Sequence, residues 1–307
     1  MKFLLPLGAL LPLCLCECSC PADFREVPRP RVDTVAQVKE LSSCQIKHYG
    51  TTLLAEARST AVASALLERG ALPDGTIIRN GKAESGTALL HNTNPAIAKL
   101  LLQAGADAGM TCGTEGHSPL CTAARKGDTA ALSLMLNSGV QPDTKDAEGA
   151  TPLYLAAANL HYDACQLLLS KGASPDSTHT SDNSAPLHAA LRAAGSADTK
   201  LRLAQMLLQA GANPLHADAE GMTPLHLAPA AVTPLLIAAG GSVHAEDMRG
   251  RTPLFYSKDP AQAEALLQAG AVINTRDHLG NTAFDTVTDA RVKSLLLVRG
   301  ANSGSTL

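Results

Sequence analysis

The stretch "DAEGATPLYLAAA" at residues 146–158 recurs as "DAEGMTPLHLAPA" at residues 218–230, with ten of thirteen positions identical. In each copy a threonine stands directly before a proline. This pair predicts the start of a helix, because threonine caps a helix and proline at the first helical position loses no hydrogen bond. The preceding Asp and Gly favour a tight turn. The copies therefore predict a repeated scaffold rather than a duplicated active site.

Similar triplets recur along the chain, so the two copies belong to a longer series. A glycine stands just before most triplets; these glycines are Gly86, Gly116, Gly149, Gly221, Gly250 and Gly280. Their spacing is 33 residues from Gly116 to Gly149 and 30 residues from Gly250 to Gly280. Ser184 takes the corresponding place in the unit between Gly149 and Gly221. Each unit closes on an apolar run and a glycine, as in "LLLQAGAD" at 100–107 and "LLLSKGAS" at 167–174. Such a closure predicts a second helix that ends at glycine.

With this period, these "TPLH"-like triplets and these closures, the sequence resembles ankyrin repeat proteins. The resemblance covers residues 50–302, about eight units, of which the first is degenerate. It implies an all-α solenoid of stacked helix-turn-helix units with β-turn or hairpin fingers. It also implies a non-enzymatic protein-binding module whose partner lies along the concave face.

Unequal unit lengths predict irregular stacking. The units that begin at Thr87, Thr223, Thr252 and Thr282 lack three or four residues, so we expect inner helices about one turn shorter. Pro229, where the other copy has Ala157, should end its helix early. Three residue pairs predict fresh starts of outer helices: Asn94-Pro95, Thr233-Pro234 and Asp259-Pro260. The unit from Ala185 gains five residues, including "GSADTK", which predict an enlarged loop.

The N-terminal segment has the order of a secretory signal. Lys2 precedes an apolar run from Phe3 to about Cys16 and then small residues, so residues 1–22 are predicted to be a signal peptide. As a helix the run covers roughly 21 Å, short of the roughly 30 Å hydrocarbon core of a bilayer. The cysteines resemble a bacterial lipoprotein signal, in which one carries lipid; the candidates are Cys14, Cys16, Cys18 and Cys20. Ordinary cleavage after Ala22 is the alternative.

These features predict an exported bacterial protein of the periplasm, cell envelope or medium, with membrane contact only through a lipid anchor. After the signal we expect a proline-rich tether (residues 23–33), a capping helix (34–49) begun by Asp33, and a tail (303–307). The later cysteines, Cys44, Cys112, Cys121 and Cys165, are scattered and predict neither a disulfide framework nor a zinc site. Cys121 and Cys165 fall on apolar helix positions, which favours burial.

Composition and motifs argue against several functions. The net charge is −3 and the chain has no Trp, four Tyr and four Phe, so we do not expect nucleic-acid binding. The sequence has no phosphate-binding loop, HExxH or GxSxG motif. His188 and His226 belong to the repeated triplet, which favours hydrogen bonding to the fingers over catalysis. No catalytic residue, cofactor, metal or small-molecule substrate is therefore expected.

The variable finger positions, Ala150 and Met222 among them, are expected to be exposed and to form the contact surface. The two fingers nearest the C-terminus carry the most anchor-type side chains. We expect the protein partner at Met248, Arg249, Arg251, Tyr256, His278 and Leu279. The alternative interpretation is that these are solvated finger tips. An alternative function is a protective or inhibitory accessory of an exported cell-envelope enzyme. The chain is expected to be a monomer, and the sequence does not identify the partner.

Overall fold

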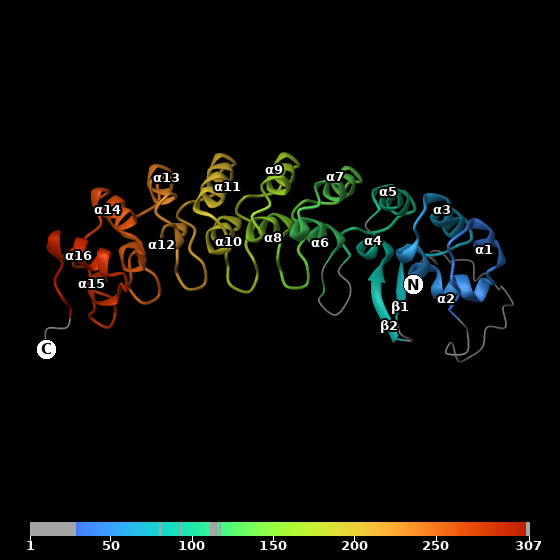
Figure 1. Cartoon of the computed structure of the whole chain (residues 1–307), viewed down its shortest axis with the longest axis horizontal. Coiled ribbons are helices and arrows are strands. Elements are labelled where there is room, and N and C mark those ends of the chain that lie inside the picture. The colour runs from blue at the N-terminus through green and yellow to red at the C-terminus, as the bar shows by residue number, and fades with distance from the viewer. Residues whose placement is uncertain (1–28, 80–81, 93, 111–115, 117, 305–307) are drawn as a thin grey trace, which may run out of the picture.

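A computed structural model describes residues 29–79, 82–92, 94–110, 116 and 118–304. Figure 1 shows a row of outer helices along the convex side of an arch, a row of inner helices beneath it, and finger loops on the concave side. The predicted signal peptide with Cys14, Cys16, Cys18 and Cys20 lies outside the described residues, as does most of the predicted tether. Among the described residues, no helix is long and apolar enough to cross a membrane.

Pairs of one inner and one outer helix form the stack. The inner row consists of α2 (Ser43–Glu56), α4 (Ala88–His91), α6 (Pro119–Lys126), α8 (Pro152–Ala158), α10 (Pro186–Arg192), α12 (Pro224–Leu227), the 3₁₀ helix η2 (Pro253–Tyr256) and α15 (Ala283–Thr286). The outer row consists of α3 (Thr60–Glu68), α5 (Pro95–Gln103), α7 (Thr129–Asn137), α9 (Tyr162–Ser170), α11 (Ala197–Gln209), α13 (Thr233–Ala238), α14 (Pro260–Gln268) and α16 (Ala290–Val298). The short α1 (Val35–Glu40) precedes them. One finger is an antiparallel hairpin of β1 (Asp74–Arg79) and β2 (Lys82–Thr87), with Asp74 opposite Thr87.

The inner helices begin where the repeated triplet predicts. The Thr151 hydroxyl accepts a hydrogen bond from the Tyr154 N–H at 3.2 Å, and Ser118 accepts one from Cys121 at 3.1 Å. Both caps precede a proline that opens the helix. Each cap satisfies a backbone donor that has no partner inside the helix, which fixes where the chain leaves the finger.

The core is continuous because each outer helix buries the same position. The residue four before the closing glycine is 0–3% exposed in all eight outer helices: Leu66, Leu101, Met135, Leu168, Leu207, Leu236, Leu266 and Leu296. The closing glycines have positive φ, as at Gly172 (φ +88°). Each pair thus buries its apolar face against its neighbours, as in a solenoid stabilised by nearest-neighbour interfaces.

The predicted differences in helix length are confirmed. Four inner elements, α4, α12, η2 and α15, have four residues, whereas α6 has eight and α8 has seven. Helix α12 ends at Leu227, two residues before Pro229. Asn94 and Asp259 cap α5 and α14 as predicted.

Other boundaries were predicted wrongly because competing local interactions decide them. Thr34, not Asp33, caps α1, since Thr34 forms a capping box with Gln37. Ser42 forms a second capping box with Gln45, so residues 34–49 contain two helices, and α2 continues past residue 50 to Glu56. Helix α13 begins at Thr233 itself, with Val232 at the cap position.

The predicted loop enlargement after Ala185 is also wrong. Helix α11 begins at Ala197, inside the inserted segment, and has 13 residues, against nine in α9. The Ser196 hydroxyl accepts a hydrogen bond from the Thr199 N–H at 3.1 Å. A serine cap in front of helix-forming residues therefore turns the insertion into an extra helical turn.

The described cysteines include two free thiols and one disulfide-bonded residue. Cys121 and Cys165 are free and fully buried, which confirms their predicted role as small apolar residues, and burial raises the pKa of each thiol to about 12. Cys44 is disulfide-bonded. The scattered spacing of the cysteines gave no sign of this disulfide.

Candidate functional site

An aspartate organises the turn of four fingers. The Asp146 Oδ1 atom accepts hydrogen bonds from the N–H groups two and four residues later, at 3.1 and 2.8 Å. The same pair of bonds, at 2.8–3.0 Å, recurs at Asp218, Asp247 and Asp277. All four residues are 5–7% exposed. The repeated carboxylates therefore shape the fingers, as expected for aspartate in turns.

A backbone hydrogen bond links each finger to the next. The N–H of the residue after the aspartate donates to a carbonyl of the preceding finger, as from Met248 to Glu220 at 2.9 Å and from His278 to Arg249 at 2.9 Å. Equivalent bonds of 2.7–3.2 Å run from Ala147 to Gly116, from Thr180 to Gly149 and from Ala219 to Asp182. The finger tips therefore form one continuous row with fixed spacing.

The triplet histidines support this row from below. The His188 Nε2 atom lies 3.0 Å from the Met222 carbonyl oxygen, and the His226 Nε2 atom lies 3.0 Å from that of Arg251. A carbonyl only accepts, so Nε2 carries the proton, and Nδ1 accepts from the N–H three residues earlier. Burial lowers the pKa of both, that of His188 to about 4. Both rings are neutral hydrogen-bond bridges at pH 7.

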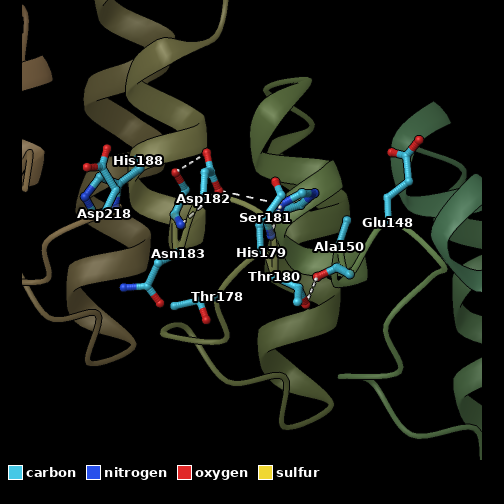
Figure 2. Close-up of polar contacts among 12 residues, drawn as sticks. Glu148, Ala150, Thr178, His179, Thr180, Ser181, Asp182, Asn183, His188 and Asp218 are labelled. Atoms are coloured by element: carbon cyan, nitrogen blue, oxygen red, sulfur yellow. Dashed lines mark hydrogen bonds and ion pairs between the residues drawn. The ribbon is translucent and has the colours of Figure 1, made fainter. Parts of the chain in front are cut away.

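The finger at residues 178–184 departs from the pattern (Figure 2). His179 takes the aspartate's place: its Nδ1 accepts from the Ser181 N–H at 3.3 Å and lies 2.8 Å from the Ser181 hydroxyl. The turn is one residue longer, because the His179 N–H bonds Ser184, five positions on, and Asn183 adopts φ +54°. The substituted finger keeps its place in the row.

A second polar group stabilises this longer finger. Asp182 accepts from the N–H and hydroxyl of Ser184, at 3.0 and 2.7 Å, and lies 3.6 Å from Arg192. Burial raises the pKa of Asp182, but the Ser184 hydrogen bonds and the charges of His179 and Arg192 outweigh this effect and lower it. The Arg192 guanidinium also donates to the buried Asp218 carboxylate of the next finger.

The structure places the six predicted contact residues on two adjacent fingers and η2. Met248 is 71% exposed and Leu279 is 82% exposed, and Arg249 and His278 are also exposed. Arg251 and Tyr256 are only partly exposed, and each already makes a side-chain hydrogen bond to an aspartate. The Arg251 Nε–H donates to Asp277 at 3.0 Å, and the Tyr256 hydroxyl donates to Asp247.

Two finger positions expected to be exposed are buried instead. Ala150 is 1% exposed and Met222 is 8% exposed. In both, the N–H donates to the turn aspartate, and the Met222 carbonyl accepts from His188. The residue after the finger glycine therefore belongs to the turn, not the tip. Sequence reasoning also missed the bridging role of Arg192; the signal was that a buried repeated aspartate requires a nearby cation.

The described part of the chain contains no group of three or more His, Cys, Asp or Glu side chains placed to hold a metal ion. The four turn aspartates and the two triplet histidines are engaged in turns and in links between fingers. The exposed side chains of the tips, such as Arg249 and His278, remain available to a ligand.

Comparisons with known proteins agree with this geometry. Residues 85–179 match the family model for ankyrin repeats (3 copies). The chain has the ankyrin-repeat fold. A crystal structure of the ankyrin repeat domain of Bcl-3, described as a unique member of the IkappaB protein family, is similar with a TM-score of 0.60 and 22% identity. The match covers 71% of this chain and 97% of that one. No curated protein sequence matches the chain.

The predicted all-α ankyrin solenoid is therefore confirmed as the fold class. Ankyrin repeats are generally protein–protein interaction modules, and the fold is a typical non-enzymatic scaffold. The 22% identity carries no information on which protein this solenoid binds.

Proposed function

We propose that this ankyrin solenoid binds a protein partner along its concave face, with the principal contact at the tips of the fingers that carry Met248 and Leu279. The observation that carries the proposal is the pair of large, exposed apolar side chains on neighbouring fingers, 71% and 82% exposed. The backbone bond from His278 to Arg249 joins these fingers. Because this bond fixes the spacing of the two finger backbones, a partner does not have to order them on binding.

The six residues divide into two roles in this proposal. Met248, Arg249, His278 and Leu279 present side chains to the partner. Arg251 and Tyr256 bond Asp277 and Asp247 and so hold the anchors in register. A partner gains from such preorganisation because the surface is already ordered before it binds.

The repeat unit is proposed to extend beyond the matched residues. The eight helical pairs between α2 and α16 share the buried position four residues before the closing glycine. This shared core position supports eight ankyrin units, which give a concave face long enough for an extended partner surface.

The test uses matched pairs of exposed apolar residues. The natural partner is first purified with the full chain, and its Kd is then measured against Met248→Ala/Leu279→Ala and against Leu297→Ala/Val298→Ala, whose side chains are exposed on α16. We expect at least tenfold weaker binding for the finger variant, the loss typical of interface anchors, and no change for the α16 variant. Unchanged binding by the finger variant would refute the placement. An enzyme partner whose activity changes on binding would identify an accessory role.

We also propose that the chain is exported. The disulfide at Cys44 supports this, because disulfides persist in oxidising compartments and are rare in the cytosol. The apolar N-terminal run after Lys2 supports it independently. Mass spectrometry of the mature N-terminus tests the proposal: a diacylated cysteine indicates anchoring, cleavage near Ala22 indicates release, and an intact Met1 rejects export.

A further inference from the structure

A cavity of about 530 Å³ opens where the inner helices are shortest. Its walls come from three consecutive repeats, at α10, α12 and the loop after η2. Residues Ala228, Pro229 and Ala230 line it where α12 has already ended. Pro229 therefore creates the space, because it prevents the helix from continuing across the gap.

Two lysines line this cavity without an acidic partner. Lys200 projects from α11 and donates to the Leu191 carbonyl at 2.7 Å, while Lys258 follows η2 and is exposed. The pKa of Lys200 is lowered by burial and then by the charge of Lys258, so the two ammonium groups repel each other. Among the described residues, no ion pair involves either lysine.

The other titratable groups of the cavity already have hydrogen-bond partners. Arg192 bonds Asp218 and Ser184. Asp259 caps α14 by accepting from the Ala261 N–H at 2.7 Å. The imidazole of His226 is saturated by Thr223 and the Arg251 carbonyl. The cavity lining thus carries three cations, Lys200, Lys258 and Arg192, against the one carboxylate of Asp259, so its net charge is positive.

The walls between these charges are partly apolar. Leu191, Leu227 and Tyr256 all line the cavity. Its volume is that of a small-ligand or side-chain pocket, too small for a folded element. An apolar pocket with convergent cations suits a carboxylate on a short aliphatic stem, since a carboxylate between two ammonium groups relieves their repulsion and forms charge-assisted hydrogen bonds.

We infer that this cavity receives a glutamate or aspartate side chain from an acidic segment of the protein partner, held between the ammonium groups of Lys200 and Lys258. The inference rests on the proposed function and adds the chemistry of the partner. Tyr256 lines the cavity and its hydroxyl donates to Asp247, the residue before Met248, so the cavity and the first proposed anchor belong to neighbouring parts of the same repeat. The partner segment then places an acidic residue beside the apolar residues that meet the finger tips.

Fluorescence anisotropy with labelled hexaglutamate and hexaglutamine peptides tests this chemistry on the full chain. We expect hexaglutamate to bind and hexaglutamine to bind at least tenfold more weakly. Lys200→Met/Lys258→Gln should weaken hexaglutamate binding at least tenfold, whereas Lys99→Gln, an exposed lysine of α5, should not. Melting curves of both variants show that they fold.

The outcomes separate this inference from the proposed function. Equal binding of the two peptides, or full hexaglutamate binding by the double lysine variant, overturns the cavity assignment. Competition by millimolar inorganic phosphate, equal to that by glutamate peptide, also overturns it, because the site would then take any small anion. The Met248→Ala/Leu279→Ala variant tests the proposed function separately. If this variant loses partner binding while the peptide test fails, the finger contact is supported and the acidic segment is rejected.

Discussion

The Arg251 Nε atom lies 3.0 Å from the Asp277 Oδ2 atom, so one ion pair joins two neighbouring fingers. The other oxygen of Asp277 accepts the N–H groups of Leu279 and Asn281 and shapes its own finger. Burial raises the pKa of Asp277, but the hydrogen bonds from Asn281, Arg251 and Leu279 outweigh it and lower the pKa. One carboxylate therefore couples the turn within a finger to the spacing between fingers.

Removing the Arg251 charge should destabilise the solenoid. In Arg251→Met, Asp277 keeps its turn hydrogen bonds but loses its cation while its side chain stays 1% exposed. We predict a loss of about 1–3 kcal/mol in the free energy of unfolding, the cost of leaving a buried charged group short of a partner. Urea denaturation measures it. Arg249→Met, at an exposed neighbouring tip, should change stability by less than about 0.5 kcal/mol, and equal losses would contradict the coupling.

Stability should fall on acidification through His188. Burial lowers its folded pKa to about 4, below the ordinary histidine value of 6.5. The unfolded chain takes up the proton first, so this contribution falls as pH drops from about 6.5 to 4, by about 3 kcal/mol. His226, whose pKa is also lowered, acts in the same direction. We predict that His188→Gln shows a smaller drop in unfolding free energy between pH 7 and pH 4.5 than the unmodified chain. His244→Gln, at an exposed loop residue, should keep the full slope.

Two glycines with similar backbone angles should differ in their tolerance of a side chain. At Gly149 (φ +82°) a Cβ would lie 2.2 Å from the Thr180 Oγ1 atom, whereas at Gly172 (φ +88°) it would meet nothing within 4 Å. We predict that Gly172→Ala costs about 1–2 kcal/mol, from backbone strain alone. Gly149→Ala should cost more, because the next finger must also shift. Urea denaturation of both variants measures the difference in unfolding free energy. Equal losses would contradict the prediction, because the clash of the new Cβ at residue 149 with Thr180 would then cost nothing.

Repetition made most of the fold predictable. The residues that form caps, turns and core recur, so the threonine cap, the turn aspartate and the apolar run before each closing glycine could be predicted by comparing units within one chain. Helix truncation followed from the three or four residues that the short units lack and, at α12, also from Pro229, which ends the helix by a local steric effect.

Features that depend on one-off contacts were not predictable in this way. Arg192 reaches Asp218 from the end of α10, and the pairing appears in no sequence spacing. The burial of Met222 follows from turn geometry, which places it below the tip. The lysine cavity combines a missing helical turn with Lys200 from a lengthened outer helix, and neither departure alone indicates it.

The buried thiols give a direct test of core integrity. Cys121 and Cys165 are 0% exposed, and burial raises the pKa of both to about 12, so almost no thiolate exists at pH 8. Because the thiolate is the nucleophile, we predict that iodoacetamide leaves both unmodified in the folded protein and alkylates both in denaturing urea. Peptide mass mapping follows each cysteine separately. Cys44 should stay unmodified in both conditions until a reductant is added, because it is disulfide-bonded. Rapid alkylation of Cys165 in the folded protein would mean that α9 opens locally, since this thiol becomes accessible only when the outer helix leaves the stack.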